Sequence, residues 1–246
     1  MSPDLLEPVA DAAWPARERE RLGGWRLNAT DGFSLRINAC WPLGEPDRDP
    51  ESAIDAVEAF YAARGLPARF KLTEGASAPS DLADRLAGRG YAIHGETLVM
   101  TGPVVGLADP DVVLSAAPDP AFEAVLVASA KGNLADARER LEALARIPAP
   151  ARFARLAVDG RTAALGACAI DGGAVGIFGM RTDPDFRRRG LARRVLDALL
   201  AEAAGLGART AYLQVEAANA PAIALYAARG FSAAYRYRYW SRPSGD

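Results

Sequence analysis

The chain has 246 residues, of which 50% are hydrophobic, and it carries a formal net charge of −2 at pH 7 with a pI of about 5.6. This length suits one large domain or two small ones, and the slightly acidic balance argues against general binding to nucleic acid. The apolar runs are too short to cross a membrane, and residues 1–7 lack the basic and apolar parts of a signal peptide. We therefore expect a cytoplasmic protein without a membrane partner.

The cysteine and histidine content argues against a Cys/His metal site. Cys40 and Cys168 lie far apart in apolar, strand-like stretches, which is typical of reduced core residues. His94 is the single histidine, so no Cys/His cluster is available to hold a metal ion. We expect no metal.

The first 105 residues read as a small unit of alternating helices and strands. A charged helix is expected over residues 16–22, followed by a hairpin whose strands, 25–28 and 33–38, flank Asp31-Gly32. The elements expected after it are a polar loop at 42–50, a helix at 53–61, a strand at 70–73, a helix at 79–88 and a strand at 91–100. The Gly- and Pro-containing stretch 101–111 is the expected link, and we place the boundary after residue 105.

The remaining residues, 106–246, predict a larger unit of mixed composition. In chain order we expect a strand at 112–114, helices at 120–130 and 134–146, a hairpin of 152–158 with 162–170, a strand at 174–180, a helix from 191, a strand at 210–216, a helix through Tyr226 and a last strand at 235–240.

The two units end with the same order of elements and glycine residues. The first unit ends with a helix, Gly65, a strand, a helix and then Arg89-Gly90-Tyr91. The second unit ends with the same order of elements, which closes with Arg229-Gly230-Phe231. The first copy departs from the second in its loop 43–50, which is acidic. We expect it to be degenerate, and either to pack against the second unit, to wall a substrate pocket there, or both.

The segment between the strand at 174–180 and the helix from 191 predicts an anion site. Gly190 has no Cβ, so a ligand can approach the backbone there, and the first N–H groups of a helix have no partner within it. Arg187, Arg188 and Arg189 precede the helix, where positive charge opposes the helix dipole unless an anion is bound. A solvated basic patch, or a patch for nucleic acid, is the competing interpretation, and the acidic pI disfavours the latter.

The spacing Arg187-x-x-Gly190-x-Ala192, with Asn219, Tyr226 and Gly230-Phe231 following in order, resembles the acyl-CoA pyrophosphate loop and core of the GNAT (Gcn5-related N-acetyltransferase) superfamily. The resemblance implies an α/β (α+β) fold in which a mixed, mostly antiparallel sheet is flanked by helices, here in tandem with a smaller, degenerate GNAT-like unit. It also implies an N-acetyltransferase that uses acetyl-CoA as cosubstrate and an amine acceptor as partner. A non-catalytic acyl-CoA-binding module is the alternative, and a homodimer is left open.

The resemblance also carries residue roles. It implies that acetyl-CoA is bound by Met180, Arg181, Thr182, Arg187, Arg188, Arg189, Gly190, Leu191, Ala192, Arg193, Asn219 and Tyr226. Tyr226 matches the general acid of the family, although a core aromatic residue would fit the same helix. Asn219 is also a good helix N-cap.

The general base is where the match departs from the family pattern. Several family members carry Glu at the position of Gln214, and glutamine cannot accept a proton. Glu216 lies two residues further, on the same side of a regular strand, and is our candidate base. A surface carboxylate with no catalytic role, or proton loss through water alone, remains open.

Overall fold

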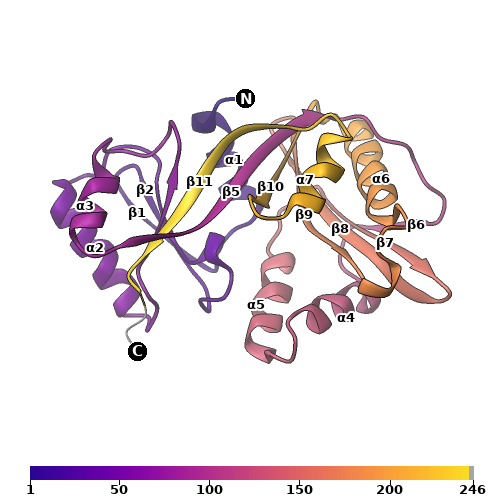
Figure 1. The fold of residues 1–246 in the computed structure, drawn as a ribbon, viewed down its shortest axis with the longest axis horizontal. Coiled ribbons are helices and arrows are strands. Elements are labelled where there is room, and N and C mark those ends of the chain that lie inside the picture. The colour runs from indigo at the N-terminus through magenta and orange to yellow at the C-terminus, as the bar shows by residue number, and fades with distance from the viewer. Residues whose placement is uncertain (244–246) are drawn as a thin grey trace.

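The computed structural model describes residues 1–243, and in them eleven strands form one sheet (Figure 1). The strands are β1 (Glu18–Leu22), β2 (Trp25–Ala29), β3 (Cys40–Pro42), β4 (Arg69–Thr73), β5 (Ala92–Pro103), β6 (Val112–Ser115), β7 (Ala151–Val158), β8 (Arg161–Asp171), β9 (Ala174–Thr182), β10 (Thr210–Glu216) and β11 (Ser232–Ser241). The helices are α1 (Pro3–Ala13), α2 (Pro50–Ala62), α3 (Leu82–Gly88), α4 (Pro120–Ser129), α5 (Leu134–Ala145), α6 (Leu191–Gly205) and α7 (Ala220–Ala227), with short 3-10 turns at Leu35–Ile37 and Pro184–Phe186.

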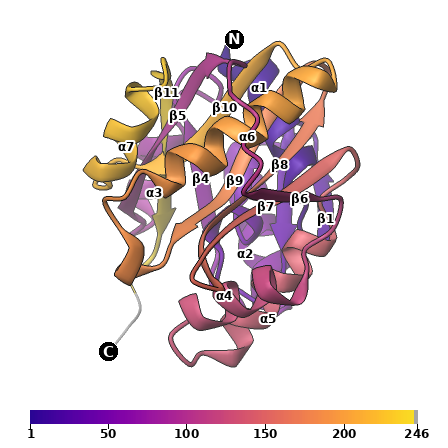
Figure 2. The same cartoon turned by 90° about the vertical axis from the view of Figure 1, so that its right-hand side faces the viewer.

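The sheet is mixed but mostly antiparallel, which confirms the expected fold class. Its order is β1-β2-β3-β4-β11-β5-β10-β9-β8-β7-β6, and only the β3–β4 and β9–β10 pairs are parallel. Helix α6 covers one face of the second unit, while α1 and α4 pack on the other face (Figure 2). No helix in residues 1–243 combines the length and apolarity that a membrane span needs.

The two units exchange their last strands. Strand β5, from the first unit, pairs with β10 of the second, and β11, from the second unit, pairs with β4 of the first. The two exchanged strands pair with each other and run through the middle of the molecule (Figure 1). Counted outward from this central pair, β4, β3, β2 and β1 match β10, β9, β8 and β7, so the predicted repeat appears as a pseudo-two-fold arrangement. Because one sheet runs through both units, the boundary after residue 105 stays a prediction.

Equivalent hydrogen bonds align the ends of α3 and α7 in the two copies. The N–H of Tyr91 donates to the carbonyl of Leu86 over 3.0 Å, and the N–H of Phe231 donates to the carbonyl of Tyr226 over 3.1 Å. Leu86 is therefore the counterpart of Tyr226 in the first copy. The first copy therefore has an aliphatic side chain where the second has a phenol.

The start of the chain differs from the sequence prediction. Residues 16–22 were expected to be helical, but Glu18–Leu22 form the edge strand β1. The first hairpin therefore turns at Gly23-Gly24, where a Cβ on Gly23 would lie 2.4 Å from the backbone nitrogen of Asp47. The segment expected as the second hairpin strand, 33–38, is instead a loop with a 3-10 turn, because its N–H groups bond to a side chain from the second unit rather than to a strand.

Candidate active site

The parallel strands β9 and β10 separate at the centre of the second unit. Their pairing runs from Thr210 opposite Ala174 to Leu213 opposite Ile177, although both strands continue further. Beyond that point the edge of β9 that faces β10 has lost its strand partner. Its backbone groups are available to bind an extended ligand as another strand would.

A bulge in β9 sets the direction of the free strand end. Ala167 pairs with Phe178, but Leu165 pairs with Arg181, so two residues of β9 lie opposite Gly166 alone. Gly179 supplies the positive φ, +62°, that this bulge requires. A Cβ on Gly166 would lie 2.3 Å from the sulfur of Met180, so this glycine makes room for the bulged side chain.

The start of α6 has the features of an anion site. Gly190 occupies the N-cap position with φ +75° and offers no side-chain cap, which leaves the first N–H groups of the helix without an acceptor. Arg187, Arg188 and Arg189 are exposed beside it, and within residues 1–243 no carboxylate forms an ion pair with any of them. The donor set therefore fits a diphosphate.

The remaining residues of the predicted loop divide between core and surface. Leu191 is buried in the core under α6, and Ala192 is half-buried. Arg193 is exposed but faces a separate surface pocket beside residues 107–111, with a volume of about 390 Å³. Its side chain is thus not brought together with Tyr226.

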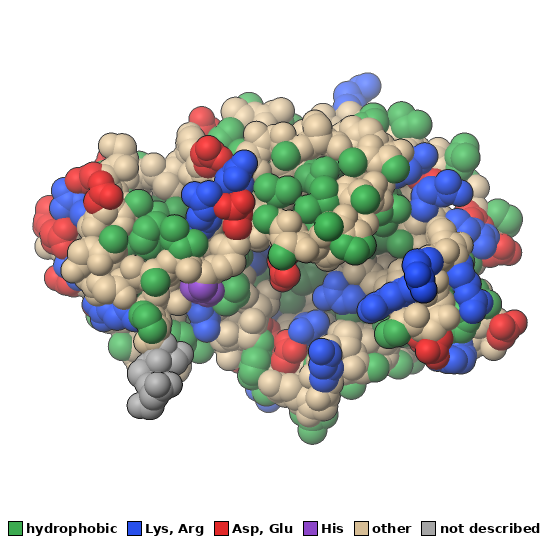
Figure 3. Space-filling view, in the orientation of Figure 1, with side chains coloured by type: hydrophobic (Ala, Val, Ile, Leu, Met, Phe, Trp, Pro, Cys, Tyr) green, Lys and Arg blue, Asp and Glu red, His purple; other side chains and the backbone are tan. Residues whose placement is uncertain are grey.

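A cavity of about 580 Å³ opens between the separated strand ends. It brings together five predicted residues, namely Met180, Arg181, Glu216, Asn219 and Tyr226. Figure 3 shows the hollow between the part of the molecule that carries α7 and the part that carries α5, with basic side chains beside it. Thr182 and the arginine triplet lie outside its lining.

The cavity also contains residues that the sequence did not single out. They come from the first unit, from the exchanged strands β5 and β11, and from α4 and α5. These residues are Trp14, Phe33, Ser34, Leu35, Arg36, Thr97, Phe122, Leu126, Asp136, Arg140, Leu144, Tyr237 and Tyr239. The first unit therefore lines the cavity as well as packing against the second unit. The sequence carried no signal for the residues that come from the loop of the first unit. It carried none for those on the exchanged strands either, because periodicity does not encode a strand exchange.

Tyr226 contributes a buried phenol to the cavity wall. Its side chain is buried beside Phe231 on α7, and within residues 1–243 its hydroxyl has no hydrogen-bond partner. Burial raises the pKa of Tyr226 to about 12, and the positive charge of Arg181 opposes that rise. The hydroxyl thus keeps its proton at neutral pH. Asn219 caps the same helix, since its side-chain oxygen accepts from the N–H of Ala222 over 3.3 Å.

The two polar side chains at the end of β10 differ in their surroundings. The side-chain oxygen of Gln214 accepts a hydrogen bond from the Tyr237 hydroxyl over 2.8 Å, so the exchanged strand β11 fixes this amide. Glu216 is exposed at the end of the strand and lines the cavity. Glu216 and Tyr226 therefore line the same cavity.

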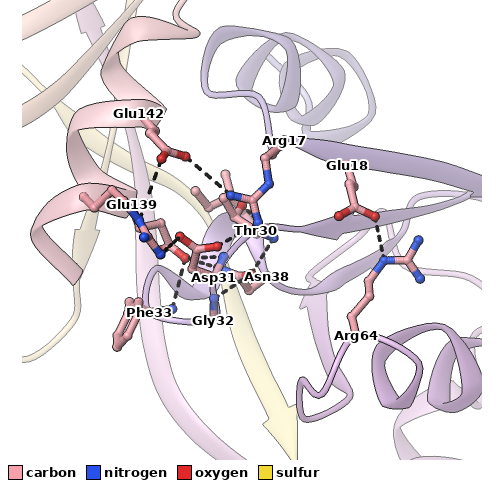
Figure 4. Close-up of polar contacts among 12 residues, drawn as sticks. Arg17, Glu18, Thr30, Asp31, Gly32, Phe33, Asn38, Arg64, Glu139 and Glu142 are labelled. Carbon is pink, nitrogen blue, oxygen red and sulfur yellow. Dashed lines mark hydrogen bonds and ion pairs between the residues drawn. The ribbon is translucent and has the colours of Figure 1, made fainter. Parts of the chain in front are cut away.

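One buried carboxylate joins the second unit to a loop of the first (Figure 4). Glu139, on α5, accepts from the backbone N–H groups of Asp31, Phe33 and Ser34 at 2.8, 3.2 and 2.5 Å. It also accepts from the side-chain amide of Asn38 at 3.1 Å. Because these groups have no strand partner, the carboxylate satisfies donors that would otherwise be buried unpaired, and it holds the loop that walls the cavity.

The chain is similar in sequence to known acetyltransferases. Residues 5–240 match the family model described as "Probable histone acetyltransferase Rv0428c C-terminal". The chain is 26% identical to "Uncharacterized N-acetyltransferase YobR" of Bacillus subtilis, over 95% of this chain and 96% of that protein. It is 39% identical to the ribosomal protein bS18-alanine N-acetyltransferase of Salmonella typhimurium, over 37% of this chain and 62% of that protein.

Among solved structures, a GCN5-related N-acetyltransferase from Kribbella flavida superposes with a TM-score of 0.71 at 19% identity, covering 100% of this chain and 97% of that one. A tandem GNAT protein from the clavulanic acid biosynthesis pathway superposes with a TM-score of 0.57 at 17% identity, covering 81% and 72%. These two likenesses concern the fold.

Proposed function

Since the chain belongs to the family described as "Probable histone acetyltransferase Rv0428c C-terminal" and is a GNAT-type N-acetyltransferase, we propose that it transfers an acetyl group from acetyl-CoA to a primary amine by direct attack. The observation that carries the proposal is the position of Tyr226, a buried, proton-bearing phenol in a cavity between two separated strands. The acceptor is the amine of a small molecule or of a protein.

The chain's own groups divide the work of binding. Arg187, Arg188, Arg189 and the free N–H groups at the start of α6 hold the diphosphate of the cosubstrate. The unpaired edge of β9 around Met180 and Thr182 binds the pantetheine amides and polarises the thioester carbonyl. Asn219 and Arg181 complete this side of the site.

The transfer needs two proton movements. The amine nitrogen attacks the carbonyl carbon of the thioester, a C–N bond forms, and the C–S bond breaks. Tyr226 gives its proton to the departing sulfur, while Glu216 takes a proton from the amine directly or through a water. Gln214 stands where a base would be expected, and this favours the alternative of a non-catalytic acyl-CoA-binding module.

Replacing Tyr226 separates these two possibilities. We expect Tyr226→Phe to lower kcat for thiol release about 100-fold while acetyl-CoA affinity stays within a factor of two, because only the transferable proton is removed. Tyr91→Phe, in the first unit, is the matched control and should keep wild-type turnover. Because the pKa of Tyr226 is raised to about 12, wild-type kcat should show no loss from its ionisation between pH 7 and 10.

Equal turnover in Tyr226→Phe and wild type would remove Tyr226 from the mechanism. Tight acetyl-CoA binding with no thiol release for any amine would instead identify a binding module.

A further inference from the structure

Two nitrogen donors in the cavity wall have no acceptor within the described residues. The Nε atom of Arg36 and the Nε2 atom of Gln214 are both buried and both make no hydrogen bond in residues 1–243. Both residues line the same cavity. A buried donor without an acceptor costs about 1–3 kcal/mol, so such a pair in a substrate cavity points to an acceptor atom on the ligand.

The two donors belong to the wall of the same cavity. The Gln214 amide is bonded to the Tyr237 hydroxyl, and the Tyr237 ring lies 5.4 Å from that of Tyr239. Arg36, Gln214, Tyr237 and Tyr239 all line this cavity. Arg36 and Gln214 therefore belong to the wall of one cavity, in which Tyr237 fixes the Gln214 amide.

The charges of the cavity wall do not balance. Arg140 is engaged by Asp136 in two hydrogen bonds of 2.7 Å, so that pair is neutral. Arg181 bonds only to the backbone carbonyl of Met180, and Arg36 has no carboxylate partner in residues 1–243. Two arginines therefore face the cavity against the single remaining carboxylate, Glu216.

The backbone of Arg36 is fixed by hydrogen bonds of its loop. Its backbone carbonyl accepts from the indole nitrogen of Trp41 over 3.0 Å. The loop on which it lies is fixed by Glu139, as described above. A fixed loop loses little backbone entropy when its arginine binds an anion.

From these observations we infer that the acceptor amine also carries a carboxylate, which Arg36 and Gln214 bind, as in a free amino acid. This inference deepens the proposed acetyl transfer and rests on it. Arginine and a carboxamide N–H match a carboxylate in charge and in donor geometry. The aromatic and aliphatic wall, with Trp14, Phe33 and Phe122, suits an apolar side chain. A polyamine or lysine-rich peptide would instead bring positive charge against Arg36 and Arg181.

Matched acceptor pairs test the inference. A panel of apolar α-amino acids and ω-amino acids is assayed for thiol release from acetyl-CoA, each beside its own amide, which keeps the amine and the side chain but removes the negative charge. We expect kcat/KM to be about 30-fold higher for the acid of the best pair. The amine of an amide loses its proton more easily than that of the acid, so amine basicity cannot produce this preference.

The role of Arg36 is tested by the same ratio. Arg36→Gln should lower the acid-to-amide ratio of kcat/KM about 30-fold, and Arg36→Lys should restore part of it. Arg21→Gln is the control, because Arg21 is an exposed arginine on the edge strand β1 and should leave the ratio unchanged.

The outcomes separate the inference from the proposal beneath it. Thiol release with amides, polyamines or lysine peptides that equals or exceeds that of every acid would overturn the inference and leave the acetyl transfer standing. An unchanged ratio in Arg36→Gln would remove Arg36 from the site. Acetyl-CoA binding without thiol release for any amine would overturn the acetyl transfer and the inference together.

Discussion

The equivalent helices α2 and α6 of the two copies differ in how their N-termini are capped. In the first copy, α2 is capped by Asp49, whose side-chain oxygen accepts from the N–H of Ser52 over 3.0 Å. These hydrogen bonds from Ser52 lower the pKa of Asp49, so the cap is ionised at neutral pH. In the second copy, α6 starts at Gly190 with no side-chain cap. The first copy thus provides its own anion, whereas the second leaves the position free for a ligand.

The same contrast extends to the chemistry around the helix. The first copy has Leu86, fully buried, where the second has Tyr226. Its β3–β4 pairing is limited to Cys40 opposite Phe70, and its loop 43–50 lacks the arginine triplet. The two copies therefore share a backbone fold. A few side chains, at the start of one helix and the end of another, decide which copy binds the cosubstrate and reacts.

The largest effect is expected when a carboxylate is placed at the start of α6, as Asp49 places one at the start of α2. Gly190→Glu places a carboxylate at the start of α6 and adds a Cβ at a positive φ, so we expect acetyl-CoA affinity to fall more than 100-fold. Arg189→Glu should act in the same direction through charge alone. Arg48→Glu, in the corresponding loop of the first copy, is the matched control. Calorimetric titration measures all three, and unchanged affinity in Gly190→Glu would refute the site.

A smaller effect is expected where the copies meet. Glu139→Gln replaces two acceptor oxygens by one and leaves N–H groups of the loop 31–34 unpaired, so we expect the free energy of unfolding to fall by about 2 kcal/mol. The loop walls the acceptor side, so KM for the acceptor should rise while acetyl-CoA affinity stays unchanged. Chemical denaturation and steady-state kinetics check the two parts. Equal loss of acetyl-CoA affinity would mean that the loop does not act on the acceptor side alone.

The smallest effect is expected from opening the first copy. Asp49→Ala removes the cap of α2 and should lower Tm by about 2 °C, without creating a second acetyl-CoA site, because that loop offers no arginine triplet. Asp49 has a lowered pKa in the folded protein, so its carboxylate stabilises the fold only while it is ionised. The difference in Tm between Asp49→Ala and wild type should therefore be present at neutral pH and vanish as pH falls through the pKa of Asp49. A new site in this variant would show that the cap alone had blocked binding.

Local sequence patterns predicted most helices and strands of the second unit, and they predicted the repeat between the two units. The strands and helices from 112 to 240 follow their hydrophobic periodicity, and the Arg–Gly loop marks the helix start at Leu191. The charged run at residues 18–22 was wrongly predicted as a helix, because an edge strand exposes its side chains and so loses the apolar alternation. The exchange of β5 and β11, and with it Tyr237 beside Gln214, depends on contacts between residues far apart in sequence.

The number of acetyl-CoA molecules bound per chain shows whether the second copy alone binds the cosubstrate. Titration of the wild-type protein by calorimetry should give one site, located in the second copy and lost in Gly190→Glu. Two sites per chain would contradict the account, since the first copy would then bind the ligand despite Asp49 and its acidic loop.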